Sequence, residues 1–143
     1  MNKTAENKET SEVTKSYSGQ FSEMMGIRLD VCDGGICKFD VEIREFQKQQ
    51  RGFVHGGILS ALIDHCGGTA AASTLGPDEY VLTSDMNISY LRPALPPKII
   101  LEGQVIKRGK TLIVSEVKVY NSDASRTLCT VGRVTLPVIK KGK

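Results

Sequence analysis

The chain contains a single long helical pattern, and this limits the folds that are available to it. Residues 58–75 are mostly apolar and small residues with helical spacing, entered through His55-Gly56-Gly57 and ended by the turn residues 76–80. A sheet has to cover its apolar face with another layer. Because no second long helix is predicted, residues 58–75 must lie across one face of any sheet that the other segments form.

Strand patterns flank this helix on both sides. Residues 27–45 predict a hairpin that turns at Asp33-Gly34-Gly35, since these residue types tolerate positive φ angles. Apolar and charged residues alternate from Lys38 to Arg44, as is typical of an antiparallel sheet with one solvated face. Four more strands are predicted after the helix: 80–92, 98–108, 111–121 and 126–138.

The order of two strands, one long helix and four strands predicts an α+β chain. Hairpin turns dominate its second half, so the sheet is expected to be antiparallel. One long central helix wrapped by a curved antiparallel sheet of five to six strands is the hotdog fold. Residues 18–140 are expected to form it as a single domain, with a short helix over 20–26. Residues 1–17 are almost entirely polar and are expected to be a disordered tail.

Composition and charge exclude several classes of function. The net charge is only +3 and the basic residues are scattered, whereas nucleic-acid binding needs a concentrated basic face. No segment resembles a secretion signal or approaches the roughly 20 apolar residues that span a bilayer, so no membrane partner is expected. With His55 and His65 as the only histidines, no metal site is predicted. The protein is expected to be cytoplasmic, and its four cysteines are expected to remain thiols there. They are Cys32, Cys37, Cys66 and Cys129.

A carboxylate, Asp64, interrupts the apolar helix. At about 100° per residue, the large apolar residues of 58–66 share one stripe, whereas Asp64 lies beside Ser60 on another side. Asp64 can therefore face water or a second subunit. A solvated aspartate is the common case, but the apolar and small residues around this one favour a function. The small residues at 67 and 68 predict close packing, either on the sheet or on the same helix of a second protomer.

The helix is entered through His55-Gly56-Gly57, which has two interpretations. Glycines can simply relieve strain in a tight entry. Alternatively, the unpaired N–H groups of the first turn and the positive helix end can stabilise a developing oxyanion, and the absence of side chains lets a substrate carbonyl approach.

Three segments resemble the phenylacetate-pathway (PaaI-like) branch of hotdog acyl-CoA thioesterases. They are QQRGFVHGGILSALID, TSDMNISYLRPA and VIKRGKTLIVSEVKVYN, and the similarity extends over residues 20–137. His-Gly-Gly alone is a weak motif, but its combination with an acid nine residues later, the DMNISYLRPA strand and the KRGKT turn is specific. The resemblance implies hydrolysis of an acyl-CoA to a free acid and coenzyme A, without a cofactor.

The resemblance also implies a role for each catalytic residue. Asp64 is the carboxylate that attacks the thioester carbonyl or activates water to do so. The N–H of Gly56 stabilises the oxyanion, and His55 orients the thioester or its loop. Gln49 stands where many relatives carry asparagine and would hold the water or the carbonyl. Thr83 orients the water.

Substrate contacts and assembly follow from the same resemblance. In such enzymes the site lies between two subunits, one giving Gln49, His55 and Gly56, and the other giving Asp64 and Thr83. A homodimer with shared sites is therefore expected, assembled as a dimer of dimers into a homotetramer. The residues expected to bind the acyl-CoA are Gly57, Ser84 (the rival of Thr83), Tyr90, Arg92, Pro93, Lys107, Arg108, Gly109 and Lys110.

Three other functions fit a hotdog chain. An acyl-CoA sensor would bind without hydrolysis, but such regulators usually carry a DNA-binding helical segment, for which residues 1–17 are too short and polar. A hydratase or dehydratase would place a histidine-led pair differently. A scaffold with vestigial chemistry would have no need of Asp64, His55 and Gly56.

Overall fold

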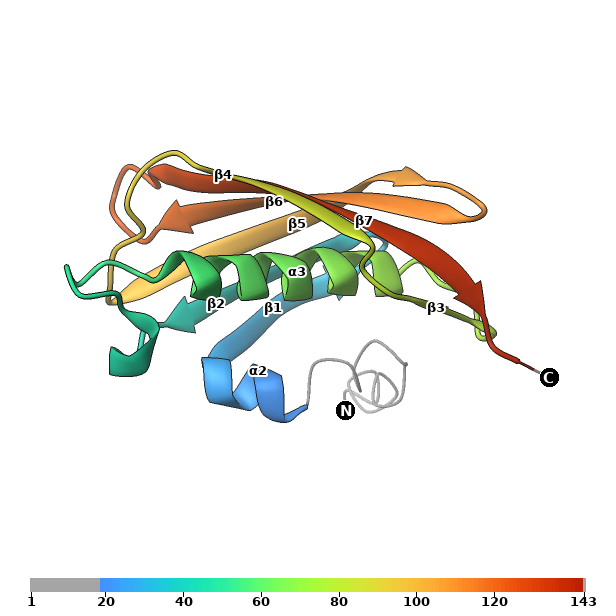
Figure 1. Cartoon of the computed structure of the whole chain (residues 1–143), viewed down its shortest axis with the longest axis horizontal. Coiled ribbons are helices and arrows are strands. Elements are labelled where there is room, and N and C mark those ends of the chain that lie inside the picture. The colour runs from blue at the N-terminus through green and yellow to red at the C-terminus, as the bar shows by residue number, and fades with distance from the viewer. Residues whose placement is uncertain (1–18, 143) are drawn as a thin grey trace, which may run out of the picture.

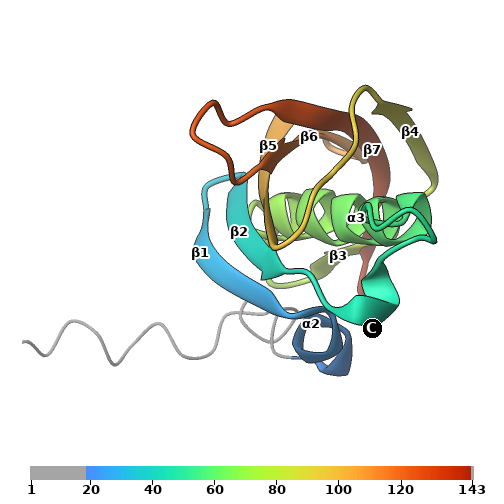
Figure 2. The same cartoon turned by 90° about the vertical axis from the view of Figure 1, so that its left-hand side faces the viewer.

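A computed structural model describes residues 19–142, so the expectation of a disordered tail over 1–17 lies outside the described part. Within 19–142, seven strands form one antiparallel sheet that curls around a single long helix (Figures 1 and 2). The elements follow in the order α2 (Gln20–Met25), β1 (Ile27–Asp33), β2 (Ile36–Glu42), η1 (Glu45–Gln47), α3 (Gly56–Ala72), β3 (Glu79–Val81), β4 (Asp85–Tyr90), β5 (Lys98–Arg108), β6 (Leu112–Asn121) and β7 (Leu128–Lys140). The hotdog fold predicted from the order of elements is confirmed.

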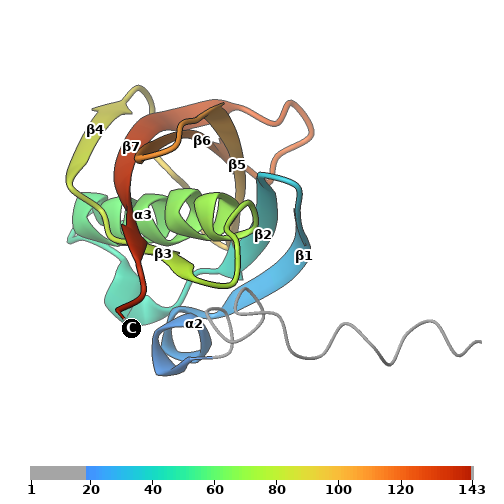
Figure 3. The same ribbon diagram turned by 90° about the vertical axis from the view of Figure 1, so that its right-hand side faces the viewer.

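The strand order in the sheet is β1-β2-β5-β6-β7, and β7 then pairs with both β3 and β4. Viewed from either end of α3, the sheet encloses the helix on one side, and β3 crosses its C-terminal half on the other (Figures 2 and 3). The core lies between α3 and the inner face of the sheet, where Leu62, Ile63 and Phe39 are among the largest fully buried side chains.

The predicted β1–β2 hairpin is confirmed in its start and its turn, whereas β2 ends at Glu42, three residues before the predicted end. Gly34 and Gly35 adopt positive φ angles of 56° and 86°, and Asp33 pairs with Ile36 across them. The short helix α2 also ends as predicted, because Gly26 takes the left-handed conformation with φ of 75°.

Helix α3 begins two residues before its predicted start and ends three residues before its predicted end. At the start, Gly56 and Gly57 are already helical. At the end, the hydroxyls of Ser73 and Thr74 donate to the carbonyls of Ala70 and Ala71, both at 2.7 Å. Side chains of this kind compete with the helical backbone pattern and favour its termination.

The strand predicted over 80–92 is two strands, which raises the count from the expected five or six to seven. β3 pairs with residues 138–140 of β7, and β4 pairs with residues 130–135 of the same strand. The segment 82–84 between them leaves the regular pairing. This prediction was wrong because every residue of the segment is compatible with a strand, so nothing local marks the interruption.

Three glycines bring α3 very close to the sheet. A Cβ atom at each would lie under 3.0 Å from a neighbour: Gly67 from Val134 Cγ2 at 2.8 Å, Gly103 from Cys66 Sγ at 2.8 Å, and Gly132 from Ile63 Cγ2 at 2.6 Å. The small residues at 67 and 68 were expected to pack either on the sheet or on the helix of a second protomer. Gly67 packs on the sheet. A Cβ at Gly68 would meet nothing nearer than 3.8 Å, so this residue lies on a more open side.

Within residues 19–142, no helix is long and apolar enough to cross a membrane. The same residues contain no group of three or more His, Cys, Asp or Glu side chains that could hold a metal ion. All four cysteines lie in the described part and form no disulfide.

Candidate active site

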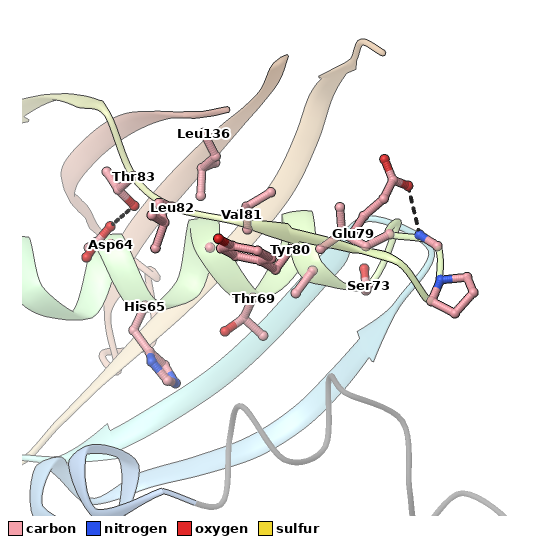
Figure 4. Close-up of a pocket in the computed structure, with 15 residues that line it drawn as sticks. Asp64, His65, Thr69, Ser73, Glu79, Tyr80, Val81, Leu82, Thr83 and Leu136 are labelled. Carbon is pink, nitrogen blue, oxygen red and sulfur yellow. Dashed lines mark hydrogen bonds between the residues drawn. The ribbon is translucent and has the colours of Figure 1, made fainter. Parts of the chain in front are cut away.

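Asp64 lies on the face of α3 that the helical periodicity predicts. The apolar stripe that includes Leu59, Leu62 and Ile63 is buried against the sheet, whereas Asp64 is half-buried on another side. The hydroxyl of Thr83 donates to Asp64 Oδ1 at 2.6 Å (Figure 4). A hydrogen bond of this length to a carboxylate is of the strong, charge-assisted kind. It fixes one carboxylate oxygen and leaves the other for chemistry.

The interruption between β3 and β4 is what brings Thr83 to α3. Ser84 is held on the sheet, since its backbone N–H and its hydroxyl both donate to the carbonyl of Thr135, at 2.9 and 3.3 Å. Thr83, one residue earlier, has left the regular pairing and turns toward the helix (Figure 4). Of the two hydroxyl residues considered from the sequence, Thr83 is thus the one beside Asp64.

His55 caps the N-terminus of α3. Its Nδ1 accepts from the N–H of Gly57 at 2.9 Å, and its carbonyl accepts from the N–H groups of Ile58 and Leu59. Of the first N–H groups of the helix, that of Gly56 therefore has no acceptor among the described residues. Because Nδ1 accepts, the hydrogen of a neutral His55 ring is on Nε2. The geometry favours Gly56 over Gly57 as a donor to a ligand.

Tyr90, at the end of β4, reaches the same helix end. Its hydroxyl donates to the carbonyl of Gly56 at 3.0 Å and so fixes the first helical peptide. A hollow of about 380 Å³ opens here and is lined by four of the predicted site residues besides Tyr90: Gln49, Gly56, Arg92 and Pro93. The amide oxygen of Gln49 accepts from the N–H of Arg51 within its own loop. The Arg92 guanidinium donates to the carbonyl of Leu128 at 2.9 Å.

A buried glutamine supports the loop that carries these groups. Gln47 is fully buried, where its side chain accepts from the N–H of Arg44 at 2.8 Å and donates to the carbonyl of Met25 at 3.0 Å. The backbone carbonyl of Gln47 accepts from the N–H of His55 at 2.8 Å. Sequence reasoning missed Gln47, because it lies in the mostly polar stretch 46–54 between the predicted hairpin and the helix. The only signal available was an amide residue eight positions before the His-Gly-Gly motif.

Within one chain, the predicted catalytic residues form two separate groups. Asp64 and Thr83 lie together at the middle of α3, whereas Gln49, His55 and Gly56 lie at its N-terminus. Gly56 and Asp64 are eight residues apart on one helix, which corresponds to about 12 Å along its axis. An oxyanion donor lies about 3 Å from its oxygen. One chain therefore does not bring the Gly56 N–H and the Asp64 carboxylate to the same carbonyl group.

The predicted basic turn lies at the far end of the molecule from Gly56. Residues 107–110 end β5 and turn into β6 near the C-terminal end of α3, whereas the N-terminus of α3 lies at the opposite end (Figure 1). Gly109 is required there, since a Cβ would lie 2.6 Å from the carbonyl oxygen of Leu112. Arg108 is already paired with Glu79 at 3.0 Å, while Lys107 and Lys110 are exposed. The structure does not join this turn to Arg92 and Pro93 within one chain.

Asp64 opens into a second hollow that sequence reasoning missed. It has a volume of about 740 Å³ and extends between α3 and β3 (Figure 4). At its far end, the N–H of Gly76 and the ammonium of Lys140 lower the pKa of Glu79 below its ordinary value. His65 lines the near end, with its ring 5.3 Å from that of Phe21, and burial lowers its pKa although Asp64 partly opposes this.

Comparisons with known proteins point to one family. The model of the thioesterase superfamily matches residues 51–127. Human acyl-coenzyme A thioesterase 13 is 36% identical over 101 residues, which are 70% of this chain and 69% of that protein. The 1,4-dihydroxy-2-naphthoyl-CoA hydrolase of Listeria monocytogenes is 29% identical over 121 residues, or 85% of this chain and 97% of that one. A thioesterase family protein from Silicibacter pomeroyi superposes with a TM-score of 0.84 and 26% identity, covering 90% of this chain and 96% of that one.

Proposed function

The chain belongs to the thioesterase superfamily, and from this premise we propose how it hydrolyses acyl-CoA. It is a thioester hydrolase with the hotdog fold. The proposed reaction is transfer of the acyl group from coenzyme A to water, which yields a free acid and a thiol. One observation carries the assignment of the site: the Asp64 carboxylate is held by the Thr83 hydroxyl at 2.6 Å, at the mouth of a hollow.

In the proposed mechanism, Asp64 acts in its ionised form. It either attacks the carbonyl carbon of the thioester or takes a proton from the water that attacks. Thr83 occupies one carboxylate oxygen and so orients the other toward the substrate. As the carbonyl carbon becomes tetrahedral, negative charge develops on its oxygen, and the carbonyl re-forms as the carbon–sulfur bond breaks. If Asp64 has taken a proton from water, it returns this proton to the leaving sulfur, which gives the free acid and the thiol. If Asp64 has attacked, a mixed anhydride forms, the thiolate takes a proton from water, and a second water hydrolyses the anhydride to the free acid and the Asp64 carboxylate.

The developing charge is proposed to be stabilised by the N–H of Gly56 and the positive end of α3. This N–H has no acceptor within the described part of the chain, so a substrate oxygen can take it without breaking an existing bond. A preorganised donor of this kind contributes about 3 kcal/mol to the stabilisation of the transition state. Tyr90 supports the donor, because it holds the carbonyl of the same residue.

The proposed active site is shared between two chains. Support for this comes from the roughly 12 Å of helix axis between Gly56 and Asp64, which is too long for both to serve one carbonyl group. The amide of Gly56, with Gln49 and His55, would come from one protomer, and Asp64 with Thr83 from its partner. We further propose a dimer of dimers in the cytoplasm, where the four cysteines remain thiols.

Coenzyme A itself is expected to use the exposed cations. Its phosphates would be bound by Lys107, Lys110 and Arg92, which carry positive charge on the surface. Pro93 and the turn glycine Gly109 would shape the contact. In a shared site, the basic turn of one protomer and Arg92 of the other would serve the same nucleotide.

Replacement of Asp64 by asparagine tests the chemistry. The Asp64→Asn protein is expected to fold and assemble like the wild type, and to release thiol from acyl-CoA more slowly by orders of magnitude. Full activity in a folded Asp64→Asn protein would contradict the assignment.

Mixed protomers test the sharing of the site. When Asp64→Asn and Gly56→Pro chains are co-expressed, random pairing gives mixed dimers with one intact site, and about a quarter of wild-type activity should return. Asp64→Asn mixed with Thr83→Val is the matched control, because both defects lie in the same half of the site and no activity should return. Equal activity in the two mixtures would exclude a shared site.

A further inference from the structure

The hollow beside Asp64 is an elongated groove that follows the second half of α3. Its floor is the helix, one wall is β3 with the residue that follows it, and Leu136 of β7 closes the back (Figure 4). The groove has a volume of about 740 Å³ and contains both Asp64 and Thr83 in its lining. Any group that occupies it therefore lies next to the proposed catalytic carboxylate.

Along one line of the helix surface, the floor of the groove carries no large side chain for two turns, whereas His65 lies beside this line at the near end. Asp64, Gly68 and Ala72 are spaced by four residues and so lie one above the other on the same face. Both Gly68 and Ala72 line the groove, and a Cβ built at Gly68 would have its nearest neighbour at 3.8 Å. The small residues on this line leave room for a chain that runs parallel to the helix axis from Asp64.

The strand side of the groove is mostly apolar and leaves large side chains uncovered. Val81 and Leu82 line it, and Leu82 remains 59% exposed. Tyr80, which lies along the groove in Figure 4, is 41% exposed. Exposed apolar side chains that gather around one hollow favour a ligand that is itself apolar.

A network of charges closes the far end. The Glu79 carboxylate accepts from the N–H of Gly76 at 3.0 Å, from Arg108 at 3.0 Å and from Lys140 at 3.2 Å. These groups already satisfy one another, and a methylene chain gains nothing by displacing them. Along α3, the groove extends from Asp64 to the C-cap residue Ser73, nine residues further, which corresponds to about 13 Å.

From this geometry we infer that the groove is the acyl-chain site and selects unbranched acyl groups of about 8–12 carbons. The inference rests on the proposed function, because it places the thioester carbonyl at Asp64. An extended chain advances about 3.6 Å per three bonds, so about 13 Å accommodates roughly eleven bonds. An aromatic ring fits a cavity of about 150 Å³, and an aryl substrate would leave most of the groove empty.

A series of acyl-CoA substrates measures the length of the groove. The expected kcat/KM rises with each methylene from 4 carbons to about 10 carbons, by at most about fourfold, which is the fold-change equivalent to about 0.8 kcal/mol per buried methylene. Beyond about 12 carbons it should level off or fall. A maximum for acetyl-CoA or phenylacetyl-CoA, or a continued rise to 16 carbons, would overturn the inference.

Two substitutions one helical turn apart make the test positional. Gly68→Leu would block the groove about 6 Å from Asp64 and should move the preferred chain to about 4–6 carbons. Ala72→Leu would block it one turn further and should move the preference to about 8 carbons. In Gly68→Leu, the ratio of kcat/KM for dodecanoyl-CoA to kcat/KM for butanoyl-CoA should fall at least thirtyfold relative to wild type, and in Ala72→Leu this ratio should fall by less.

The controls separate a blocked groove from a damaged protein. Ala124→Leu adds the same side chain in the exposed β6–β7 loop and should leave the length profile unchanged. A general loss of folding or assembly would lower kcat/KM for every chain length alike. The same length profile in all four proteins would therefore contradict the inference, whatever the absolute rates.

A binding measurement distinguishes failure of this inference from failure of the proposed function. S-alkyl-CoA thioethers of 4, 8 and 12 carbons cannot be hydrolysed, so their affinities report on the groove alone. Affinity that rises with length and drops in Gly68→Leu, without thiol release from any acyl-CoA, would support the groove and contradict the hydrolase. Thiol release with affinity that is independent of length would contradict the groove and leave the hydrolase intact.

Discussion

Replacement of Gly56 by proline would remove one hydrogen-bond donor from the proposed site and change little else. Gly56 is the first residue of α3, a position where proline is well tolerated because the helix does not use that N–H. The preceding residue, His55, has φ of −63° and ψ of 136°, which is the extended conformation that a following proline requires. The helix is therefore expected to form unchanged.

The magnitude follows from the number of donors at this helix end. The N–H of Gly57 is bonded to the His55 ring, and those of the next two residues to its carbonyl, which leaves the Gly56 N–H as the donor available to an oxyanion. Loss of one such donor costs about 2.7–4 kcal/mol of transition-state stabilisation, or a factor of about 100–1,000 in kcat. Because the interaction forms mainly in the transition state, KM should change little.

Gly56→Ala is the matched control for this variant. It adds a Cβ at the same place, 3.6 Å from the Tyr90 ring, but keeps the N–H. Its kcat should therefore fall much less than that of Gly56→Pro. Thiol release under saturating acyl-CoA gives kcat for both variants, and thermal unfolding with size-exclusion chromatography shows that they are folded and assembled. Equal rates in Gly56→Pro and Gly56→Ala would refute the role of the N–H.

Three further predictions concern the helix and its carboxylate. Thr83→Val should lower kcat about 10- to 100-fold, because a hydrogen bond to a charged group contributes about 1.5–3 kcal/mol, whereas Thr83→Ser should retain most activity. If Thr83→Val lowers kcat equally in the Asp64→Asn background, the hydroxyl does not act through the carboxylate. Burial lowers the pKa of His65 from 6.5, so the unfolded chain protonates this imidazole at a higher pH than the folded chain does. The free energy of unfolding should therefore fall as the pH drops below about 6.5, and it should fall by less in His65→Gln. Parallel curves of melting temperature against pH for the two proteins would contradict this. Gly68→Ala should raise the melting temperature by about 3 °C, because alanine favours a helix by about 1 kcal/mol over glycine. Gly67→Ala should lower the melting temperature, because the new methyl would lie 2.8 Å from a β7 side chain. A rise in both variants would mean that the helix can move away from the sheet.

The direction of Asp64 could be predicted from sequence because it depends on a local repeat. A helix of 3.6 residues per turn fixes which residues share a face, and the buried stripe of α3 then sets where Asp64 points. The β1–β2 hairpin was predictable for a similar reason, since its two turn glycines adopt the positive φ angles that other residues avoid. These features depend on residues that are neighbours in the chain.

The features that sequence could not predict depend on distant partners. The interruption at 82–84 exists because β7 pairs with two different strands along its length, and neither pairing leaves a mark on residues 82–84 themselves. The groove beside Asp64 needs β3 to cross α3, which follows from the same interruption. Gln47 looks like any polar loop residue, and its burial depends on packing of α2 against the loop before α3. Of the proposed site, the residue types and their division into two groups were expected from the family resemblance, whereas the groove beside Asp64 was not.

The three close contacts between α3 and the sheet have a consequence for engineering this molecule. Gly67, Gly103 and Gly132 set the height of the helix, while Thr83 is anchored to the sheet through the residue that follows it. A methyl group inserted beneath the helix would lift Asp64 away from its hydroxyl partner without touching either of them. Mutant libraries restricted to pocket-lining positions would omit these three glycines, although the glycines determine how well Asp64 and Thr83 stay aligned.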